Sequence, residues 1–220
     1  MFVGHYAAAF VLKAREPKAS LALLFLATQF VDILFFPFVL LGLEHLEIVP
    51  GYTEANSFKM DHYPFTHGLL GSLLWSVIVF ALVYFIMFKK RANAKSIAMV
   101  MALGVLSHWF FDLIVHTPDL PLVTGAPKFG FGLWNHVGLT FLTETFLLIL
   151  GLMYYLKQSK PLYKSGQLVP YIFTVFLVAI GYLNLFVLPE SDNVTSLTIS
   201  ALSSYFLLAF LAYLVERLRR

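Results

Sequence analysis

The stretch SIAMVMALGVLSHWFFDLIV, residues 96–115, decides the fold and also contains polar residues that are unusual in so apolar a stretch. As a helix that rises about 1.5 Å per residue, it is long enough to cross the roughly 30 Å hydrocarbon core of a bilayer. Its second half is interrupted by Ser107, His108 and Asp112. Because an ionisable residue inside an apolar span is costly, it indicates a functional group by default. The stretch therefore predicts a membrane-spanning helix that carries a polar site.

Five other stretches have a similar length and composition, and each is bounded by charged residues, Pro or Gly. The six candidate spans are Ser20–Leu43, Thr66–Phe88, Ser96–Val115, Leu133–Leu156, Val169–Leu188 and Leu197–Val215. The chain is 60% hydrophobic and only 12% charged, whereas soluble domains are roughly 25% charged. We therefore expect an all-α integral membrane protein, a six-span helical bundle in which residues 1–220 form one transmembrane domain. This composition excludes a disordered chain and a nucleic-acid-binding protein, and the absence of Cys excludes a disulfide scaffold.

Residues 1–12 are apolar but too short to cross a bilayer. Lys13, Arg15 and Lys18 follow this apolar run and no basic residue precedes it, which is not the pattern of a secretory signal peptide. We expect a short additional N-terminal helix that is retained in the protein. It lies either on the membrane surface or as a half-span that dips in against the bundle.

The charged residues are divided between the two ends of the predicted bundle. Thirteen of the 15 Lys and Arg residues lie before the first span, between spans two and three, between spans four and five, or after the last span. Only Lys59 and Lys128 lie in the other loops. Those other loops hold seven acids, which are Glu44, Glu47, Glu54, Asp61, Asp119, Glu190 and Asp192. Since basic residues mark the cytoplasmic side, both termini are predicted to be cytoplasmic, with loops 44–65 and 116–132 outside.

Three carboxylates remain inside the predicted spans: Asp32, Asp112 and Glu144. Counted from the basic residues at the cytoplasmic ends of their spans, Asp32, His108 and Glu144 lie at similar depths of roughly 20 Å. Asp112 follows one turn further out. We therefore expect polar groups from three spans to converge in the outer half of the membrane, and a structure with Asp32 and His108 on opposite sides of the bundle would contradict this.

The spacing of His108, Asp112 and His116 places them on one face of a helix. Imidazole and carboxylate groups on such a stripe are ligands for zinc, and also for manganese or iron. A simpler interpretation of His116 is that it only ends the helix. Similarly, we expect His45 to be solvated in its acidic loop and His136 to lie at the start of its span as an interfacial or capping residue.

A second pair of histidines occurs in DHYPFTH, residues 61–67, where Pro64 predicts a turn that leads into the second span. His67 would then lie at the mouth of the site. His5 would lie roughly 12 Å above Lys13 if the N-terminal helix dips into the membrane. The segment 118–134, which contains Pro-Asp-Leu-Pro-Leu and Gly-Phe-Gly-Leu-Trp, is expected to form an ordered loop over the site.

In this order the polar residues resemble those of a family of bacterial inner-membrane proteins described as membrane-bound, metal-dependent hydrolases, which are distantly similar to zinc-dependent phospholipase C. The resemblance covers about residues 1–125. It rests on an N-terminal histidine, an aspartate in the first long apolar segment, a His-x4-His turn and a helical His-x3-Asp. The matching residues are His5, Asp32, His62, Thr66, His67, His108 and Asp112. The chain departs from the family pattern at Val31, Leu34, Tyr63 and Gly68, which stand for a Pro, a second acid, an Arg and a Ser.

The resemblance implies a metal-dependent hydrolase in the bacterial inner membrane. We expect a divalent metal, zinc first and manganese or iron as alternatives, in an outward-facing His/Asp site. The expected ligands are Asp32, His67, His108 and Asp112, with His5 and His62 next. Glu144, by depth, and Asp61, by loop position, are the candidate catalytic bases. Membrane lipids are the expected partners, and a lipid or lipid-linked ester or phosphoester is the candidate substrate.

Two other functions stay open at the level of sequence. Intramembrane acids and histidines also form ion or proton paths in transporters and channels, which often contain broken helices in repeated halves; no internal repeat is evident here. Paired helical histidines also ligate haem in non-catalytic proteins, although the neighbouring aspartates are poor axial ligands. The chain has no Gly-x-Ser-x-Gly elbow and no P-loop or Gly-rich dinucleotide motif.

Overall fold

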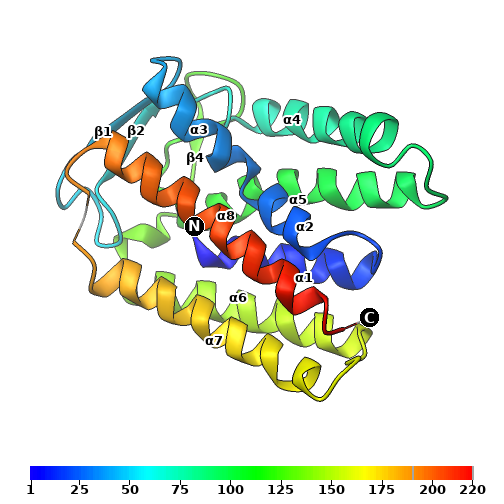
Figure 1. Cartoon of the computed structure of the whole chain (residues 1–220). Coiled ribbons are helices and arrows are strands. Elements are labelled where there is room, and N and C mark those ends of the chain that lie inside the picture. Colours follow the sequence, from blue (N-terminus) through cyan, green and yellow to red (C-terminus); the bar gives the residue numbers. More distant parts are fainter. Residues whose placement is uncertain (190, 220) are drawn as a thin grey trace.

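The computed structural model describes residues 1–189 and 191–219, so Glu190 and Arg220, which entered the charge count, lie outside the described residues. Most of the described chain is helical (Figure 1). The helices are α1 (Tyr6–Arg15), α2 (Leu21–Thr28), α3 (Phe30–Leu40), α4 (Leu69–Leu82), α5 (Ala94–Val115), α6 (Val137–Gln158), α7 (Ser165–Phe186) and α8 (Val194–Glu216). Three short turns of other helix types are η1 (Val3–His5), η2 (Val83–Met87) and η3 (Leu133–Asn135). This confirms the all-α class.

Five helices are long and apolar enough to cross a membrane, counting η2 as the continuation of α4. The pair α2 and α3 has the composition of a sixth span, but its two parts meet at an angle of 49°. Each of the six predicted stretches thus corresponds to a helix or helix pair, and the first is broken rather than continuous. The apolar helices indicate a membrane protein.

The break between α2 and α3 falls at Gln29, whose backbone (φ −104°, ψ 8°) leaves the helical region. Its side-chain amide donates to the carbonyl of Phe2 at 3.1 Å. The carbonyl of Thr28, freed from the regular helical ladder, accepts from the ring of His108 at 2.8 Å. Non-helical backbone at membrane depth is tolerated where it is buried in protein and its polar groups find partners, and both conditions hold here.

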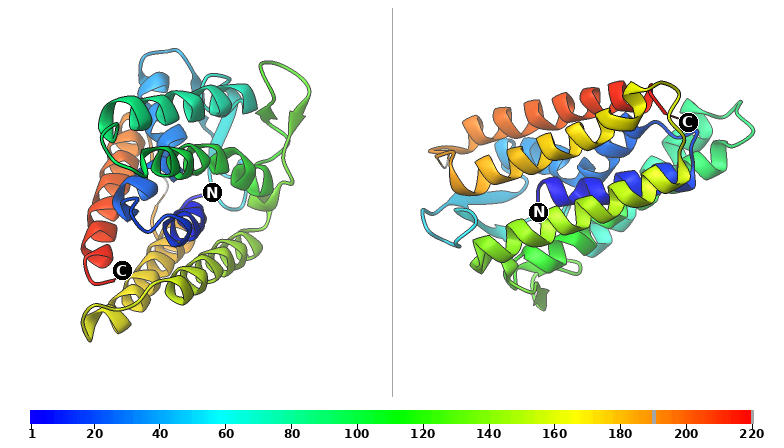
Figure 2. Two further views of the ribbon diagram at one scale, coloured as in Figure 1. Left: turned by 90° about the vertical axis from the view of Figure 1, so that its right-hand side faces the viewer. Right: turned by 90° about the horizontal axis from the view of Figure 1, so that it is seen from below.

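Helix α1 lies inside the bundle rather than on its surface. It packs against α2, α5 and α6, and Figures 1 and 2 show its N-terminal end in the middle of the molecule in all three views. The run Ala7–Ala9 gives α1 a narrow face, and a Cβ added at Gly151 of α6 would lie only 2.6 Å from the carbonyl oxygen of Ala7. Small residues on both helices therefore let the backbones approach closely. Of the two expectations for this segment, packing against the bundle is the part that the structure shows.

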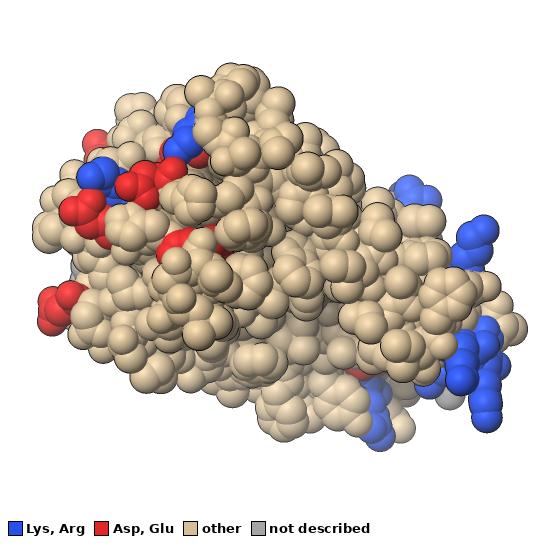
Figure 3. All heavy atoms as spheres, turned by 90° about the horizontal axis from the view of Figure 1, so that it is seen from above, with Lys and Arg blue, Asp and Glu red and all other residues tan. Residues whose placement is uncertain are grey.

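Two short antiparallel hairpins lie in the loops at one end of the bundle. One pairs β1 (His45–Ile48) with β2 (Phe58–His62), and the other pairs β3 (Leu120–Pro121) with β4 (Lys128–Phe129). In Figure 3, Asp and Glu gather at this end and most of the Lys and Arg in view at the other, with a largely uncharged surface between them. The loop 118–134 is ordered by the second hairpin and by η3.

The buried apolar side chains form two clusters. The larger contains residues near the basic ends of the helices, including Phe10, Phe25 and Leu148. The smaller lies toward the hairpins and includes Phe35, Tyr63 and Trp134. The helices that contribute to both clusters carry the polar residues described next.

Candidate metal centre

Four elements bring the predicted polar residues together. Asp32 lies in the first turn of α3, directly after the break, and His67 in the turn that leads into α4. His108 and Asp112 lie one turn apart on α5, and His5 ends η1. The Asp32 side chain is 15% exposed, whereas the other four side chains are 4% exposed or less. Two triads offer ligand atoms that lie within 4.8 Å of one another: Asp32, His67 and His108, and His5, His108 and Asp112.

Four separations between possible ligand atoms are close to those between neighbouring ligands of a metal ion. Nε2 of His67 lies 3.2 Å from Asp32 Oδ1 and 3.7 Å from Asp112 Oδ2. Nε2 of His108 lies 3.5 Å and 3.0 Å from the same two oxygens. Zinc bonds of 2.0–2.1 Å in a tetrahedron place neighbouring ligand atoms about 3.3 Å apart. Four of the six edges of the set Asp32, His67, His108 and Asp112 are therefore close to the value that an ion requires.

The hydrogen bond of His108 Nδ1 to the backbone determines that Nε2 is the ring nitrogen that faces the site. Its Nδ1 lies 2.8 Å from the carbonyl oxygen of Thr28. A carbonyl can only accept, so Nδ1 carries a proton and Nε2 is the ring nitrogen that faces the site. This Nε2 makes no hydrogen bond with any of the described residues, although Asp112 Oδ2 is 3.0 Å away.

The outer nitrogen of His67 is fixed by a relay through Thr66. The Thr66 hydroxyl donates to Glu44 Oε2 at 2.6 Å, so its oxygen is left to accept from His67 Nδ1 at 2.9 Å. Glu44 also accepts from the backbone N–H groups of Phe65 and Thr66. The buried Glu44 thereby holds the turn and the tautomer of His67 at once.

His116 shows the same pattern at the end of α5. Its Nδ1 donates to Asp119 Oδ1 at 2.9 Å, and its Nε2 lies 3.6 Å from Asp112 Oδ2. The ring of Trp134 covers it, with centroids 4.1 Å apart.

His67, His108 and His116 share one hydrogen-bonding pattern. Each of His67, His108 and His116 donates from Nδ1 to an outer acceptor and turns Nε2 toward carboxylates, as metal-ligating histidines do. Lone pairs that face carboxylate oxygens in a buried site repel one another unless a cation lies between them or the rings are protonated. The donor set therefore suits a divalent ion that prefers nitrogen and oxygen ligands.

His5 lies on the α1 side of this group. Its ring is stacked on that of His108, with centroids 3.9 Å apart and an interplanar angle of 6°. Its Nε2 is 3.2 Å from Asp112 Oδ1, which also accepts from the amino group of Met1 at 2.8 Å. The two oxygens of Asp112 thus face different neighbours, Oδ1 toward α1 and Oδ2 toward His67 and His108.

The carboxylate of Glu144 is occupied by backbone N–H groups of the N-terminal segment. Its carboxylate accepts from the N–H of Gly4 at 2.9 Å and from the N–H of Phe2 at 3.1 Å. It therefore satisfies N–H groups at the start of η1 and is favoured there by the helix dipole. It belongs to neither ligand triad.

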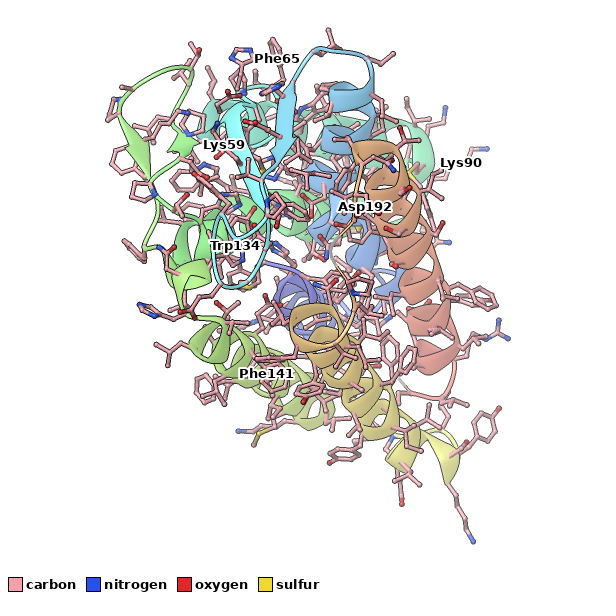
Figure 4. The ribbon with its side chains drawn as sticks, turned by 90° about the vertical axis from the view of Figure 1, so that its left-hand side faces the viewer. Lys59, Phe65, Lys90, Trp134, Phe141 and Asp192 are labelled. Carbon is pink, nitrogen blue, oxygen red and sulfur yellow. The ribbon has the colours of Figure 1, made fainter. Side chains whose placement is uncertain are left out.

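The structure does not bring Asp61 and His62 to the group. Both are exposed on β2, where backbone pairing extends from His45 to His62 before Pro64 turns the chain inward. The side chain of Asp61 contacts Nδ1 of His45 at 2.6 Å, and this hydrogen bond lowers the pKa of the Asp61 carboxyl below its usual value. Figure 4 looks onto this end of the molecule, with Lys59 on the hairpin and Phe65 on the turn that follows.

Three residues of the site were not assigned to it from the sequence. Glu44 was counted among the loop acids, yet its exposed fraction is only 3%. Asp119 was also counted among the loop acids. Tyr205 of α8 donates to Asp32 Oδ2 at 3.0 Å, but in the sequence it is one of many aromatic residues in an apolar span. The short distance in sequence between His116 and Asp119 was a signal that these two side chains interact. Nothing in the sequence pairs Glu44 with Thr66. No family model, curated protein or solved structure matches this chain.

Proposed function

We propose that the chain is a metal-dependent hydrolase of the bacterial inner membrane, in line with the resemblance found in its sequence. The carrying observation is the buried group in which the Nε2 atoms of His67 and His108 lie 3.0–3.7 Å from oxygens of both Asp32 and Asp112. His67, His108 and Asp112 would hold the metal and leave one position open for water. Asp32 would lie beside the ion, and His5 and His116 would flank it. Zinc is preferred to manganese or iron because it favours four-coordinate nitrogen and oxygen sites.

In this proposal α2 with α3, α4 with η2, and α5 to α8 form six spans. The basic end is cytoplasmic, together with both termini, because the distribution of Lys and Arg follows the positive-inside rule (Figure 3). The group then lies in the outer half of the membrane and opens outward. A bond close to the head group of a lipid or lipid-linked molecule would be within its reach.

A bound divalent ion lowers the pKa of water to about 7 and so supplies a nucleophile at neutral pH. Asp32, which would lie beside the ion rather than bind it, would accept the proton of the attacking water because it is the most exposed member of the group. Its Oδ2 accepts from Tyr205, so Oδ1 would be the proton acceptor. The water oxygen bonds to the acyl carbon or phosphorus, the bond to the leaving oxygen breaks, and that oxygen takes the proton. We assign this role to Asp32 rather than to Glu144 or Asp61, since those carboxylates are engaged elsewhere.

The packing favours this function over a transporter. A proton or ion path needs polar groups on both sides of the central site. Between the group and the basic end, the described core is formed by apolar residues such as Phe10, Phe25 and Leu148. Haem ligation by His5 and His108 is disfavoured because their rings are stacked in direct contact.

The test is an assay of the purified protein in vesicles of phosphatidylethanolamine and phosphatidylglycerol. Mass spectrometry would follow the release of head groups and fatty acids with zinc and with chelator. We expect zinc-dependent products from the wild type and none from Asp32→Asn. Proton or ion flux that depends on Asp32, in the absence of any hydrolysis product, would contradict the proposal and support the transporter.

A further inference from the structure

An apolar cavity of about 280 Å³ opens on the side of the bundle between the α2–α3 break, α4 with η2, and α5. Every residue that lines it is apolar, and the lining includes Leu26, Phe30, Leu82, Met101, Val105 and Phe206. Met101 and Val105 form its inner wall, since their exposed fractions are 6% and 0%. Leu82 stands at its rim and is 45% exposed.

On three elements, residues that line the cavity lie close in sequence to residues of the candidate metal centre. Ile33, which lines it, follows Asp32 directly, and Phe206 follows Tyr205, the hydrogen-bond donor to Asp32. On α5, Val105 precedes His108 by one turn. Asp32, the most exposed member of the polar group, is therefore adjacent in sequence to a lining residue, and so is its hydrogen-bond partner.

The shape and lining of the cavity restrict what can occupy it. An apolar wall offers no partner to a polar ligand, whose burial without hydrogen bonds is costly. A single hydrocarbon chain is narrow enough, and the cavity opens on the side of the bundle that faces the bilayer if the six-span arrangement holds.

We propose that this cavity binds one acyl chain of a bilayer lipid whose head group lies at Asp32, so that the substrate is an acyl lipid that enters from the side. This inference rests on the proposed function for the placement of the head group. Lipid tails are as apolar as the residues around them, so the cavity gives little affinity by hydrophobicity alone. Its contribution is positional, because a chain held there directs the polar end toward the metal ligands.

The experiment uses the full chain in vesicles of phosphatidylcholine that contain a small fraction of an ether-linked phosphatidylcholine with a diazirine at the end of one chain. After illumination and digestion, mass spectrometry maps the adducts. We expect adducts on Met101 and Val105, which bulk lipid does not reach. The variant Leu82→Trp, which fills the rim, should reduce them by about tenfold, equivalent to about 1.4 kcal/mol.

The matched control is Leu74→Trp, on the same helix and 56% exposed but outside the cavity lining. It should leave the adducts on Met101 and Val105 unchanged. Wild-type protein without these adducts, or equal adducts in Leu82→Trp, would overturn the proposal. Labelling does not require catalysis, so labelled protein without hydrolysis contradicts only the proposed function, and hydrolysis without labelling contradicts only the cavity.

Discussion

Two regions of the molecule place histidine beside carboxylate, and their surroundings differ. On the β1–β2 hairpin, His45 and Asp61 are 2.6 Å apart, closer than any histidine and aspartate in the buried group. Their side chains are 57% and 58% exposed, and no second carboxylate shares the contact in the described residues around them. In the buried group, Asp112 faces four histidines at 3.0–3.7 Å.

The two regions differ in burial and in the number of converging groups, not in the proximity of histidine to carboxylate. An exposed ion pair is screened by water and contributes little. The buried rings are held from behind by Thr28, Thr66 and Asp119, and their inner nitrogens converge.

Removing the metal should destabilise the protein through the buried group alone. An ion present at 1,000 times its dissociation constant stabilises the folded state by about 4.1 kcal/mol. Chelation should lower the free energy of unfolding by about that amount, as measured by thermal unfolding in detergent. His45→Ala should respond like the wild type, whereas Asp112→Asn should show no further loss. A wild type that is insensitive to chelator would contradict the account.

Weakening the support behind His67 should have the next largest effect. Replacing Glu44 by Gln removes the charged acceptor of the Thr66 hydroxyl, so the tautomer of His67 is no longer fixed. Loss of such outer partners typically lowers metal affinity by about 10- to 100-fold. Zinc titration would measure this. Glu47→Gln is the matched control, since Glu47 is exposed and pairs with Lys59 on the same hairpin. Equal affinities in both variants would remove Glu44 from the site.

Glu144→Gln should affect stability without affecting the metal. The change weakens the charge-assisted hydrogen bonds to the N–H groups of Phe2 and Gly4. The difference between charged and neutral hydrogen bonds predicts a loss of about 1 kcal/mol. Chemical unfolding together with zinc titration would check this. If Glu144→Gln folds normally but loses hydrolysis at full metal content, Glu144 is the catalytic base.

His45→Ala should have the smallest effect. Exposed ion pairs contribute at most about 1 kcal/mol, so stability and metal affinity should be nearly unchanged. The pKa of Asp61 should rise toward its usual value, because the His45 hydrogen bond is what lowers it. An NMR titration of the Asp61 carboxyl would detect this rise. A loss of metal affinity in this variant would mean that the hairpin belongs to the site.

The sequence was informative where length and periodicity govern the structure. Apolar stretches predicted the helices, and helical rise from the basic ends placed Asp32 and His108 at one depth, where they now lie 3.5 Å apart. The break at Gln29 was not foreseen, because its cause is a long-range contact with Phe2 and a carbonyl shared with His108. A uniformly apolar stretch carries no local signal for such contacts.

Loop contacts were the least predictable part of the site. Glu44 and Asp61 are both loop acids near histidines, and only the path of the hairpin decides that Glu44 is buried and Asp61 exposed. Helix neighbours were likewise undetermined by the sequence, so the contact of Tyr205 with Asp32 across the bundle could not be anticipated.

The metal content of the purified chain tests the central claim most directly. Asp61→Asn and Asp112→Asn make the same chemical change in the exposed and the buried region. We predict about one divalent ion per chain in the wild type and in Asp61→Asn, by elemental analysis. Asp112→Asn should hold little or none, because a buried metal ligand is removed. Equal metal in all three proteins, or none in the wild type after zinc loading, would contradict the account.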